Sequence, residues 1–376
     1  MKRIPLSNNV KELLRVVAAV LLALLIGFII TLFVSKDPIG AYRSFLIGPV
    51  TKLNRFGNWI QESITLMLLG LAISLVFKAE IFSLGAEGQM VIGAVISGCI
   101  ALYTPLPAPL LIPLALAGGA LGGFLLGLLP GYLKAYLNAN ELVSTLMLNT
   151  IVLKLYEYIL TDFIKAPDAG YTASPPIPEA GRLAHFFPNL PFLAELHKLW
   201  VNQTSISIMI YIAIIASVLV YYLMYRTPFG YELRMLGANI KFARYGGMDT
   251  RKTIMLATAI SGLVAGLAGA HLSMGVHNKL ILNITAGLGF EGIVVALLAR
   301  NNPALVPFTA LAYGYLRQGA IIMERSSDVS LEMVLMIQAI IILLVTAERL
   351  YPEVRRRVKA HKESKAAVTP KQEAGS

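Results

Sequence analysis

Charged residues are scarce in this sequence, and the shortage indicates its class. Only 14% of the 376 residues are Asp, Glu, Lys or Arg, whereas 56% are hydrophobic. A soluble domain carries charge on roughly a quarter of its residues. The chain is therefore expected to reside in a lipid bilayer, and its length divides into membrane-spanning helices rather than soluble domains.

Several chemical motifs are also missing. Cys99 is the single cysteine, so no internal disulfide can form, and the residue is expected to pack as a small hydrophobe. No G-x-x-x-x-G-K-[ST], G-x-S-x-G or H-E-x-x-H motif occurs. The five histidines lack the spacing of metal ligands: they are His185, His197, His271, His277 and His361. We predict no enzyme activity, cofactor or metal in this chain, so energy for any transport must come from an ion gradient or a partner.

Apolar runs of spanning length recur along the chain and predict an all-α integral membrane protein. About ten helices are expected, with the eighth the shortest, at residues 14–34, 60–77, 81–103, 108–130, 142–160, 205–225, 253–273, 287–301, 304–322 and 331–348. Residues 1–348 would form the transmembrane domain, and residues 349–376 a basic, mobile tail.

The basic residues predict the orientation of the chain. The net charge is +11, and basic clusters lie near both termini and in the loop 226–252. Lys and Arg are enriched in cytoplasmic loops, and ten spans place all three clusters on that side. The loop 161–204 then faces outward, as does the segment 36–58, although its four basic residues oppose the rule. This clustering argues for membrane lipid rather than nucleic acid as a partner.

Two short segments echo each other. Leu84–Gly88 reads LGAEG at the start of the third span, and Leu288–Gly292 reads LGFEG at the start of the eighth. By parity one span starts inside and the other outside, which is typical of an inverted repeat of five plus five helices. Such repeats move around a central site, so the pattern indicates transport of a small-molecule solute.

Polar residues inside the predicted spans are candidates for a translocation path, because such groups are costly in a bilayer. They are Glu87, Gln89, Thr145, Asn149 and Glu291. The other interpretation is that they hold helices together by hydrogen bonds. For Glu87 and Glu291 a structural or gating role is favoured over solute contact, and for Gln89 helix packing is favoured. For Thr145 and Asn149 both interpretations stay open.

The loop 226–252 combines charge with turn residues. A short helix is expected from Tyr231 to Leu236, ending at Gly237, and a second from Ile240 to Tyr245, capped by Asn239. Gly246 would close the second helix in the left-handed conformation. The alternative is an ordinary basic loop that contacts lipid headgroups. The interleaved glycines, aromatic residues and caps favour a folded element that docks on a cytoplasmic partner.

Four stretches together resemble the permease subunits of bacterial ABC importers of the simple-sugar, nucleoside and branched-chain amino acid type. They are IFSLGAEGQMVIGA (81–94), NELVSTLMLNTIVL (140–153), TPFGYELRMLGANIKFARYGGM (227–248) and GLGFEGIVVALLARNNP (287–303). The second stretch, with SPPIP at 174–178, is most similar to the nucleoside branch. Arg244 and the pair Gly247-Met248 depart from the family pattern.

The resemblance implies a multi-pass protein of the bacterial cell membrane that imports nucleosides. It implies three partners: a cytoplasmic ABC ATPase, a second and different permease, and an extracytoplasmic substrate-binding lipoprotein. The coupling segment that contacts the ATPase would contain Glu232, Arg234, Gly237, Asn239, Ala243 and Gly246. The alternatives are a simple-sugar permease, a gradient-driven secondary transporter and a membrane scaffold.

Overall fold

The computed structural model of the protein describes residues 22, 25–33, 35–166, 170–185, 203–204, 206–330, 333, 336 and 339–340. The chain forms two compact units, residues 1–49 with 319–376 and residues 50–318. Within the described residues the regular elements are all helical, and the strand-like features are two isolated bridges. The predicted all-helical fold is confirmed.

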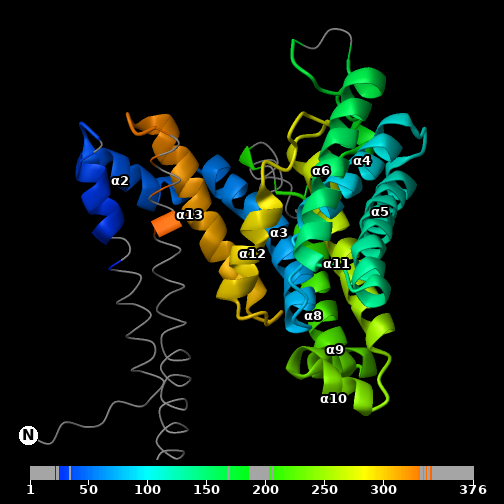
Figure 1. Cartoon of the computed structure of the whole chain (residues 1–376). Helices are drawn as coiled ribbons and strands as arrows, with labels where there is room; N and C mark the ends of the chain where they lie inside the picture. The colour runs from blue at the N-terminus through cyan, green and yellow to red at the C-terminus, as the bar shows by residue number, and fades with distance from the viewer. Residues whose placement is uncertain are drawn as a thin grey trace, which may run out of the picture. The chain divides into compact units, whose positions relative to one another are not determined.

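The larger unit contains most of the described helices (Figure 1). They are α3 (Leu53–Lys78), α4 (Ala86–Tyr103), α5 (Ala108–Leu137), α6 (Glu141–Ile159), α8 (Met209–Arg226), α9 (Pro228–Ala238), α10 (Ile240–Tyr245), α11 (Thr250–His271) and α12 (Leu288–Leu298). π-Helical turns extend α6 and α11, namely η2 (Leu160–Ile164) and η5 (Leu272–Val276). Helix α13 (Val306–Ser326) begins in this unit.

Six helices in the described part of the chain are long and apolar enough to cross a membrane. They are α3, α4, α5, α6 with η2, α8, and α11 with η5. Helix α12 is apolar but has only 11 residues. Helix α13 has 21 residues and is more polar, since it carries Arg317 and Gln318. The predicted span 331–348 lies largely outside the described residues. Of the predicted span 14–34, residues 22 and 25–33 are described, and they are helical.

Two predicted spans are too short. Helix α3 begins at Leu53 instead of residue 60, because the polar residues before the apolar run are already helical. Helix α5 continues to Leu137 instead of residue 130, with Pro130 inside it. Hydropathy marks the lipid-matched part of a helix, and both helices extend beyond that part.

Helix α11 lies at the centre of the larger unit, packed against α3, α4 and α5. Close approach depends on glycine: a Cβ on Gly123 of α5 would overlap the backbone of Gly262 in α11, and one on Gly93 of α4 would overlap that of Gly266. Small residues allow this packing between membrane helices, where hydrophobicity alone does not drive association. The glycine pairs fix α4 and α5 against α11.

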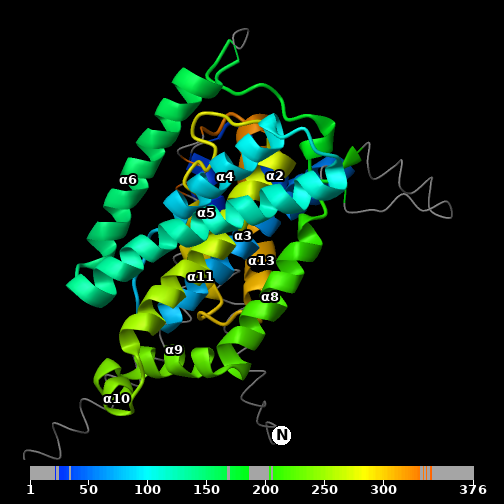
Figure 2. The same ribbon diagram turned by 90° about the vertical axis from the view of Figure 1, so that its right-hand side faces the viewer.

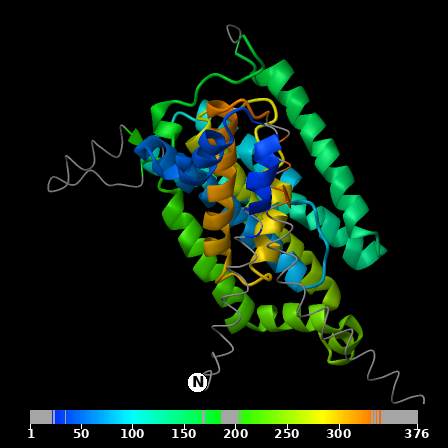
Figure 3. The ribbon, with the colours of Figure 1, turned by 90° about the vertical axis from the view of Figure 1, so that its left-hand side faces the viewer.

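The larger unit has two distinct ends. Figures 2 and 3 view it from opposite sides, and both place α9 and α10 at one end and the segment that follows α6 at the other. Helix α9 runs across the ends of α8 and α11 (Figure 2). The coupling segment is thus separated by the length of the helices from the loop predicted to face outward.

The smaller unit contains α2 (Pro38–Ile47), which Asp37 caps through a 3.0 Å hydrogen bond from the Gly40 amide. The carboxylate of Asp328 accepts hydrogen bonds from the Ser35 hydroxyl at 2.5 Å and the Lys36 amide at 2.8 Å. These bonds lower the pKa of the Asp328 carboxyl below its ordinary value, because both donors favour the charged form. They join the segment before α2 to the segment after α13.

Candidate functional site

The loop 226–252 is folded, as the sequence predicted. Helix α9 starts at Pro228, three residues before the predicted start, because the Thr227 hydroxyl caps it by accepting from the Gly230 amide at 3.1 Å. It continues to Ala238, since Gly237 remains helical instead of ending the helix. A capping threonine followed by proline at the first helical position is a start signal that the prediction overlooked.

Helix α10 has the predicted bounds and the predicted cap. The Asn239 side chain accepts from the amides of Lys241 and Phe242 at 3.0 and 3.1 Å. The predicted left-handed residue was wrong: Gly246 has a φ of −72°, and Gly247 has a φ of +77°. Either glycine of the pair could take that conformation, and it is adopted one residue later than expected, at Gly247.

Several predicted coupling residues attach α9 and α10 to the helices above them. A Cβ on Gly237 would overlap the carbonyl group of Lys78 at the end of α3, and Ala243 is fully buried. The Glu232 carboxylate lies 2.8 Å from the hydroxyl of Thr253 in α11. The guanidinium of Arg234 lies 5.2 Å from the ring centre of Tyr225 in α8. These contacts attach α9 to α3, α8 and α11.

The outward surface of this segment is rich in aromatic residues. Ile240 and three aromatic residues are exposed, with Tyr245 92% exposed; the others are Tyr231 and Phe242. Exposed side chains of Lys241 and Arg244 flank them. With Ala243 as the buried position of α10, the helical period places Phe242 and Tyr245 outside, so the signal was present in the sequence.

Glu87 lies in the first turn of α4 and is only 3% exposed. Its carboxylate accepts hydrogen bonds from the Thr285 hydroxyl at 2.5 Å, the Gly287 amide at 3.2 Å and the Gly289 amide at 2.6 Å. These donors precede and open α12. Because a Cβ on Gly289 would lie 2.6 Å from the Glu87 amide nitrogen, the N-termini of α4 and α12 adjoin each other.

The carboxylate position has an electrostatic reason. A helix N-terminus carries a partial positive charge and unpaired amide donors. Two such ends in contact repel each other unless an anion lies between them. Glu87 supplies that anion, and its carboxylate accepts hydrogen bonds from three donors of the protein itself.

Thr145 and Asn149 of α6 also serve the start of α4. The Thr145 hydroxyl accepts from the Leu84 amide at 3.1 Å. The Asn149 side chain accepts from the Gly88 amide at 3.0 Å and donates to the Leu84 carbonyl at 2.8 Å. Both side chains are buried and engaged with backbone groups, which favours helix attachment over solute contact.

Gln89 is 2% exposed, and its side-chain oxygen has no hydrogen-bond partner within the described residues. Its amide carbon would lie 3.3 Å from a Cβ on Gly262 of α11. An unpaired buried oxygen is costly and marks a position of interest. Among the five predicted path residues, Gln89 and Glu291 each have a buried oxygen without a hydrogen-bond partner within the described residues.

Glu291 has different partners from Glu87. It forms an ion pair with Arg317 of α13, whose Nε is also 2.9 Å from the carboxylate of Glu62 in α3. The three side chains are largely buried, and together they carry one excess negative charge. Within the described residues no group of three His, Cys, Asp or Glu side chains could hold a metal ion.

Comparison with known proteins gives a consistent result. Residues 55–346 match the family described as "Branched-chain amino acid transport system / permease component". The guanosine ABC transporter permease protein NupP of Bacillus subtilis is 31% identical over 341 residues, covering 90% of this chain and 94% of that protein. No solved structure matches this chain.

Two further relatives bear on the solute. The nucleoside ABC transporter permease protein NupB of Lactococcus lactis is 27% identical over 363 residues, covering 96% of this chain and 98% of that protein. The glucose ABC transporter permease protein TsgB13 of Haloferax volcanii is 28% identical over 339 residues, covering 88% of this chain and 87% of that protein.

Proposed function

We propose a transport function from one premise: this chain belongs to the family described as "Branched-chain amino acid transport system / permease component". The function is that of the transmembrane permease subunit of an ATP-driven importer, and its solutes are nucleosides. The observation that carries the solute class is the near full-length similarity to a guanosine permease and a nucleoside permease. A simple sugar is the second candidate, because a glucose permease is similar over nearly the same length.

The chain is a multi-pass membrane protein, and we infer that it lies in the bacterial cell membrane with both termini in the cytoplasm. Its ten helices would form the inverted repeat of five plus five. Packing in the larger unit supports the repeat. In the proposed repeat, α4 corresponds to α12, and α11 corresponds to α3. Helix α4 packs on α11, and in the same way α12 packs on α3. Helix α5 likewise corresponds to α13. Helix α5 contacts α11, and α13 contacts α3 through Gly314 and Ser63.

The energy would come from a separate ABC ATPase that binds α9 and α10. The exposed aromatic residues and the flanking Lys241 and Arg244 provide an apolar patch with positive charge at its edge. Such a patch suits a protein partner, because aromatic residues and arginine are enriched in interfaces. The attachment of the segment to α3, α8 and α11 then carries the partner's movement to the helices. A second permease and an extracytoplasmic substrate-binding lipoprotein complete the proposed importer.

Glu87 and Asn149 would act in gating, because each links the start of α4 to another helix. The other proposed path residues are Gln89, Thr145 and Glu291. Thr145 lies beside the start of α4, and Glu291 belongs to the ion cluster. In this arrangement α4 and α12 move together while the carboxylate holds them, and the path changes shape when α9 moves α3 and α11.

One experiment tests the function. The complete transporter, with the ATPase, both permeases and the binding lipoprotein, is reconstituted in proteoliposomes, and uptake of radiolabelled guanosine, adenosine and ribose is measured. We expect ATP-dependent uptake of the nucleosides without any ion gradient. Uptake that requires a gradient and ignores ATP would instead establish a secondary transporter. Transport of ribose alone would establish the sugar alternative.

A further inference from the structure

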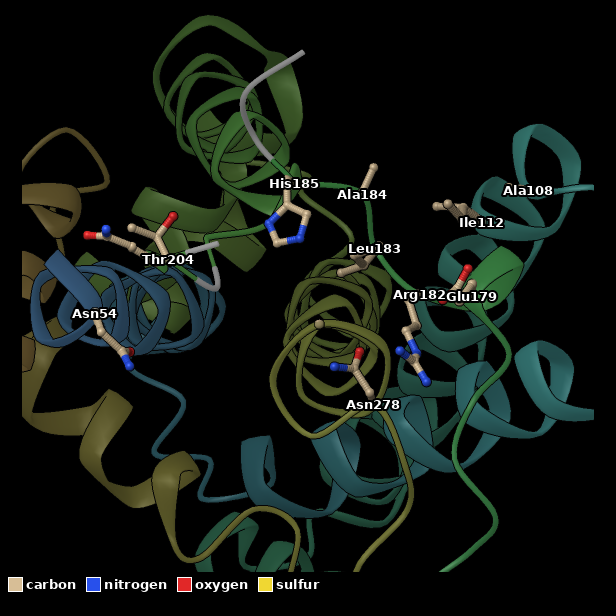
Figure 4. A pocket seen from close by; sticks show the side chains of 12 residues that line it. Asn54, Ala108, Ile112, Glu179, Arg182, Leu183, Ala184, His185, Thr204 and Asn278 are labelled. Carbon is tan, nitrogen blue, oxygen red and sulfur yellow. The ribbon is translucent and has the colours of Figure 1, made fainter. Parts of the chain in front are cut away.

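A pocket of about 540 Å³ lies in the larger unit at the end opposite α9 and α10. It is bounded by the first turns of α3 and α5, residues 179–185 and 203–204, Gly275 in η5, and Asn278 after η5. Figure 4 shows the side chains of Asn54, His185 and Asn278 around its opening. The volume is within the range of small-molecule sites. None of the predicted path residues lines it.

The walls of this pocket are held by backbone hydrogen bonds. The segment after α6 runs beside the segment after η5: the Ser174 amide donates to the Leu280 carbonyl at 2.8 Å, and the Ile177 amide to the Asn278 carbonyl at 2.8 Å. The Leu183 amide donates to the Met274 carbonyl at 3.0 Å. The pocket is therefore formed by ordered backbone instead of free loops, as a binding site requires.

The lining suits a neutral solute with many hydrogen-bonding groups. Asn54 and Asn278 each provide two donors and an acceptor. The charged lining residues, Glu179 and Arg182, have opposite signs and leave no net charge. Burial, together with the nearby Lys279, lowers the pKa of His277, so the residue before Asn278 is uncharged at neutral pH. Among the lining residues, the pair Glu179 and Arg182 gives an anionic phosphate no excess positive charge.

The floor of the pocket contains a second polar feature. Gly275 and Leu183 form this floor, and a Cβ on Gly275 would lie 3.0 Å from the imidazole of His271. His271 is fully buried; its Nδ1 lies 3.0 Å from the Thr65 hydroxyl, while Nε2 has no partner within the described residues. An unpaired buried nitrogen below a glycine floor indicates a place where a further ligand atom can be received.

The backbone at the floor is unusual as well. Helix α11 changes at His271 into the π-helical turn η5, which ends at Val276. Short π-helical turns are rare and occur often at functional sites, because the wider turn displaces side chains from the regular helix pattern. The glycine, the histidine and the π-helical turn therefore coincide at the bottom of the pocket.

We infer that this pocket is a transit site for the solute within the permease itself, resting on the proposed nucleoside function. Asn54 and Asn278 hydrogen-bond the base or ribose, and His271 is the next polar contact when the floor at Gly275 opens. The permease then contributes to solute selection after the binding lipoprotein has released its cargo.

Asn278 allows a clean test, because its φ is +53° and glycine accepts that conformation without strain. Asn278→Gly removes the amide and retains the carbonyl that pairs with Ile177. Asn283→Gly is the matched control, since Asn283 also has a positive φ, of 56°, and is exposed outside the pocket. In the reconstituted transporter we expect Asn278→Gly to raise the KM for guanosine about three- to tenfold, as for one lost hydrogen bond, and to change the ratio of guanosine to adenosine uptake. The control should match wild type in both.

Direct occupancy is measured with Asn278→Cys in a Cys99→Ala background of the full transporter. We expect guanosine to slow labelling by a membrane-impermeant methanethiosulfonate reagent, and the Asn283→Cys control to show no protection. Unchanged selectivity for Asn278→Gly together with unprotected Cys labelling would overturn the transit site. A weaker affinity for the binding lipoprotein with unchanged selectivity would overturn it too, because the pocket would then be a docking surface. In either case nucleoside uptake by wild type would leave the proposed function standing, whereas absence of that uptake would refute the function itself.

Discussion

Replacing Glu87 by glutamine tests the contact between the N-termini of α4 and α12. The side chain keeps its shape, but one carboxylate oxygen becomes an amide group that donates instead of accepting. Three donors now face the carboxylate, from Thr285, Gly287 and Gly289, so at least one of them loses its acceptor. The negative charge between the two helix ends is removed as well.

The magnitude follows from these contacts. A buried hydrogen bond to a charged group contributes about 1.5–3 kcal/mol, and an anion at a helix N-terminus about 0.3–1 kcal/mol or somewhat more when buried. We therefore expect Glu87→Gln to lower the free energy of unfolding by about 2–4 kcal/mol. Glu157→Gln is the matched control, because Glu157 pairs with Lys154 at 2.8 Å on the surface. That exposed pair should contribute no more than about 1 kcal/mol.

The assay is thermal unfolding of the detergent-purified protein, monitored by size-exclusion chromatography. Uptake is measured in parallel. Glu87→Gln should melt several degrees below Glu157→Gln and should reduce uptake more than Lys154→Ala does. A double-mutant cycle with Thr285→Val should be non-additive, because both residues share one hydrogen bond. Equal melting temperatures for the two glutamine variants, or an additive cycle, would refute the role of the Glu87 carboxylate.

Three further predictions concern other elements. Gly237→Ala should reduce uptake strongly while the protein stays in the membrane, because its Cβ would push α9 away from α3, whereas Gly170→Ala, in open space, should be neutral in uptake assays. Tyr245→Ser should reduce co-purification of the ATPase without changing the melting temperature, and Tyr103→Ser, at a tyrosine that is also exposed but lies on α4, should leave co-purification unchanged. Arg317→Gln should lower the free energy of unfolding by about 3–5 kcal/mol, seen as a lower melting temperature, because it removes the cation that pairs with Glu291 and Glu62 in a largely buried cluster.

Local features were predictable from the sequence. The cap at Asn239 depends on a side chain and amides within three residues of it, so composition and spacing are enough to find it. The spanning helices follow from hydropathy over about 20 residues, and six helices of that kind are present in the described residues. Their ends were less predictable, since polar residues such as Asn54 extend α3 beyond its apolar part.

Contacts between distant segments were not predictable in this way. Glu87 and Thr285 are separated by 198 positions, and neither local sequence indicates that the two residues are in contact. The pairing of Glu291 with Arg317 joins two helices that the sequence gives no reason to connect at those positions. The residues themselves were identifiable as important, because charge inside a span is rare, but their partners depend on how the helices pack.

The glutamates of the two similar motifs, Glu87 and Glu291, have different contacts, and the helix packing explains the difference. The starts of α4 and α12 meet each other, so one anion between them serves both helix ends. A second carboxylate at that point would add repulsion between like charges without any further donor to satisfy. Glu291 is therefore free for another purpose and pairs with the cation of Arg317, which itself also needs the Glu62 carboxylate. A recurring sequence motif thus gives an asymmetric arrangement, in which one glutamate joins the starts of α4 and α12 and the other takes part in an ion cluster that joins α12, α13 and α3 around Arg317.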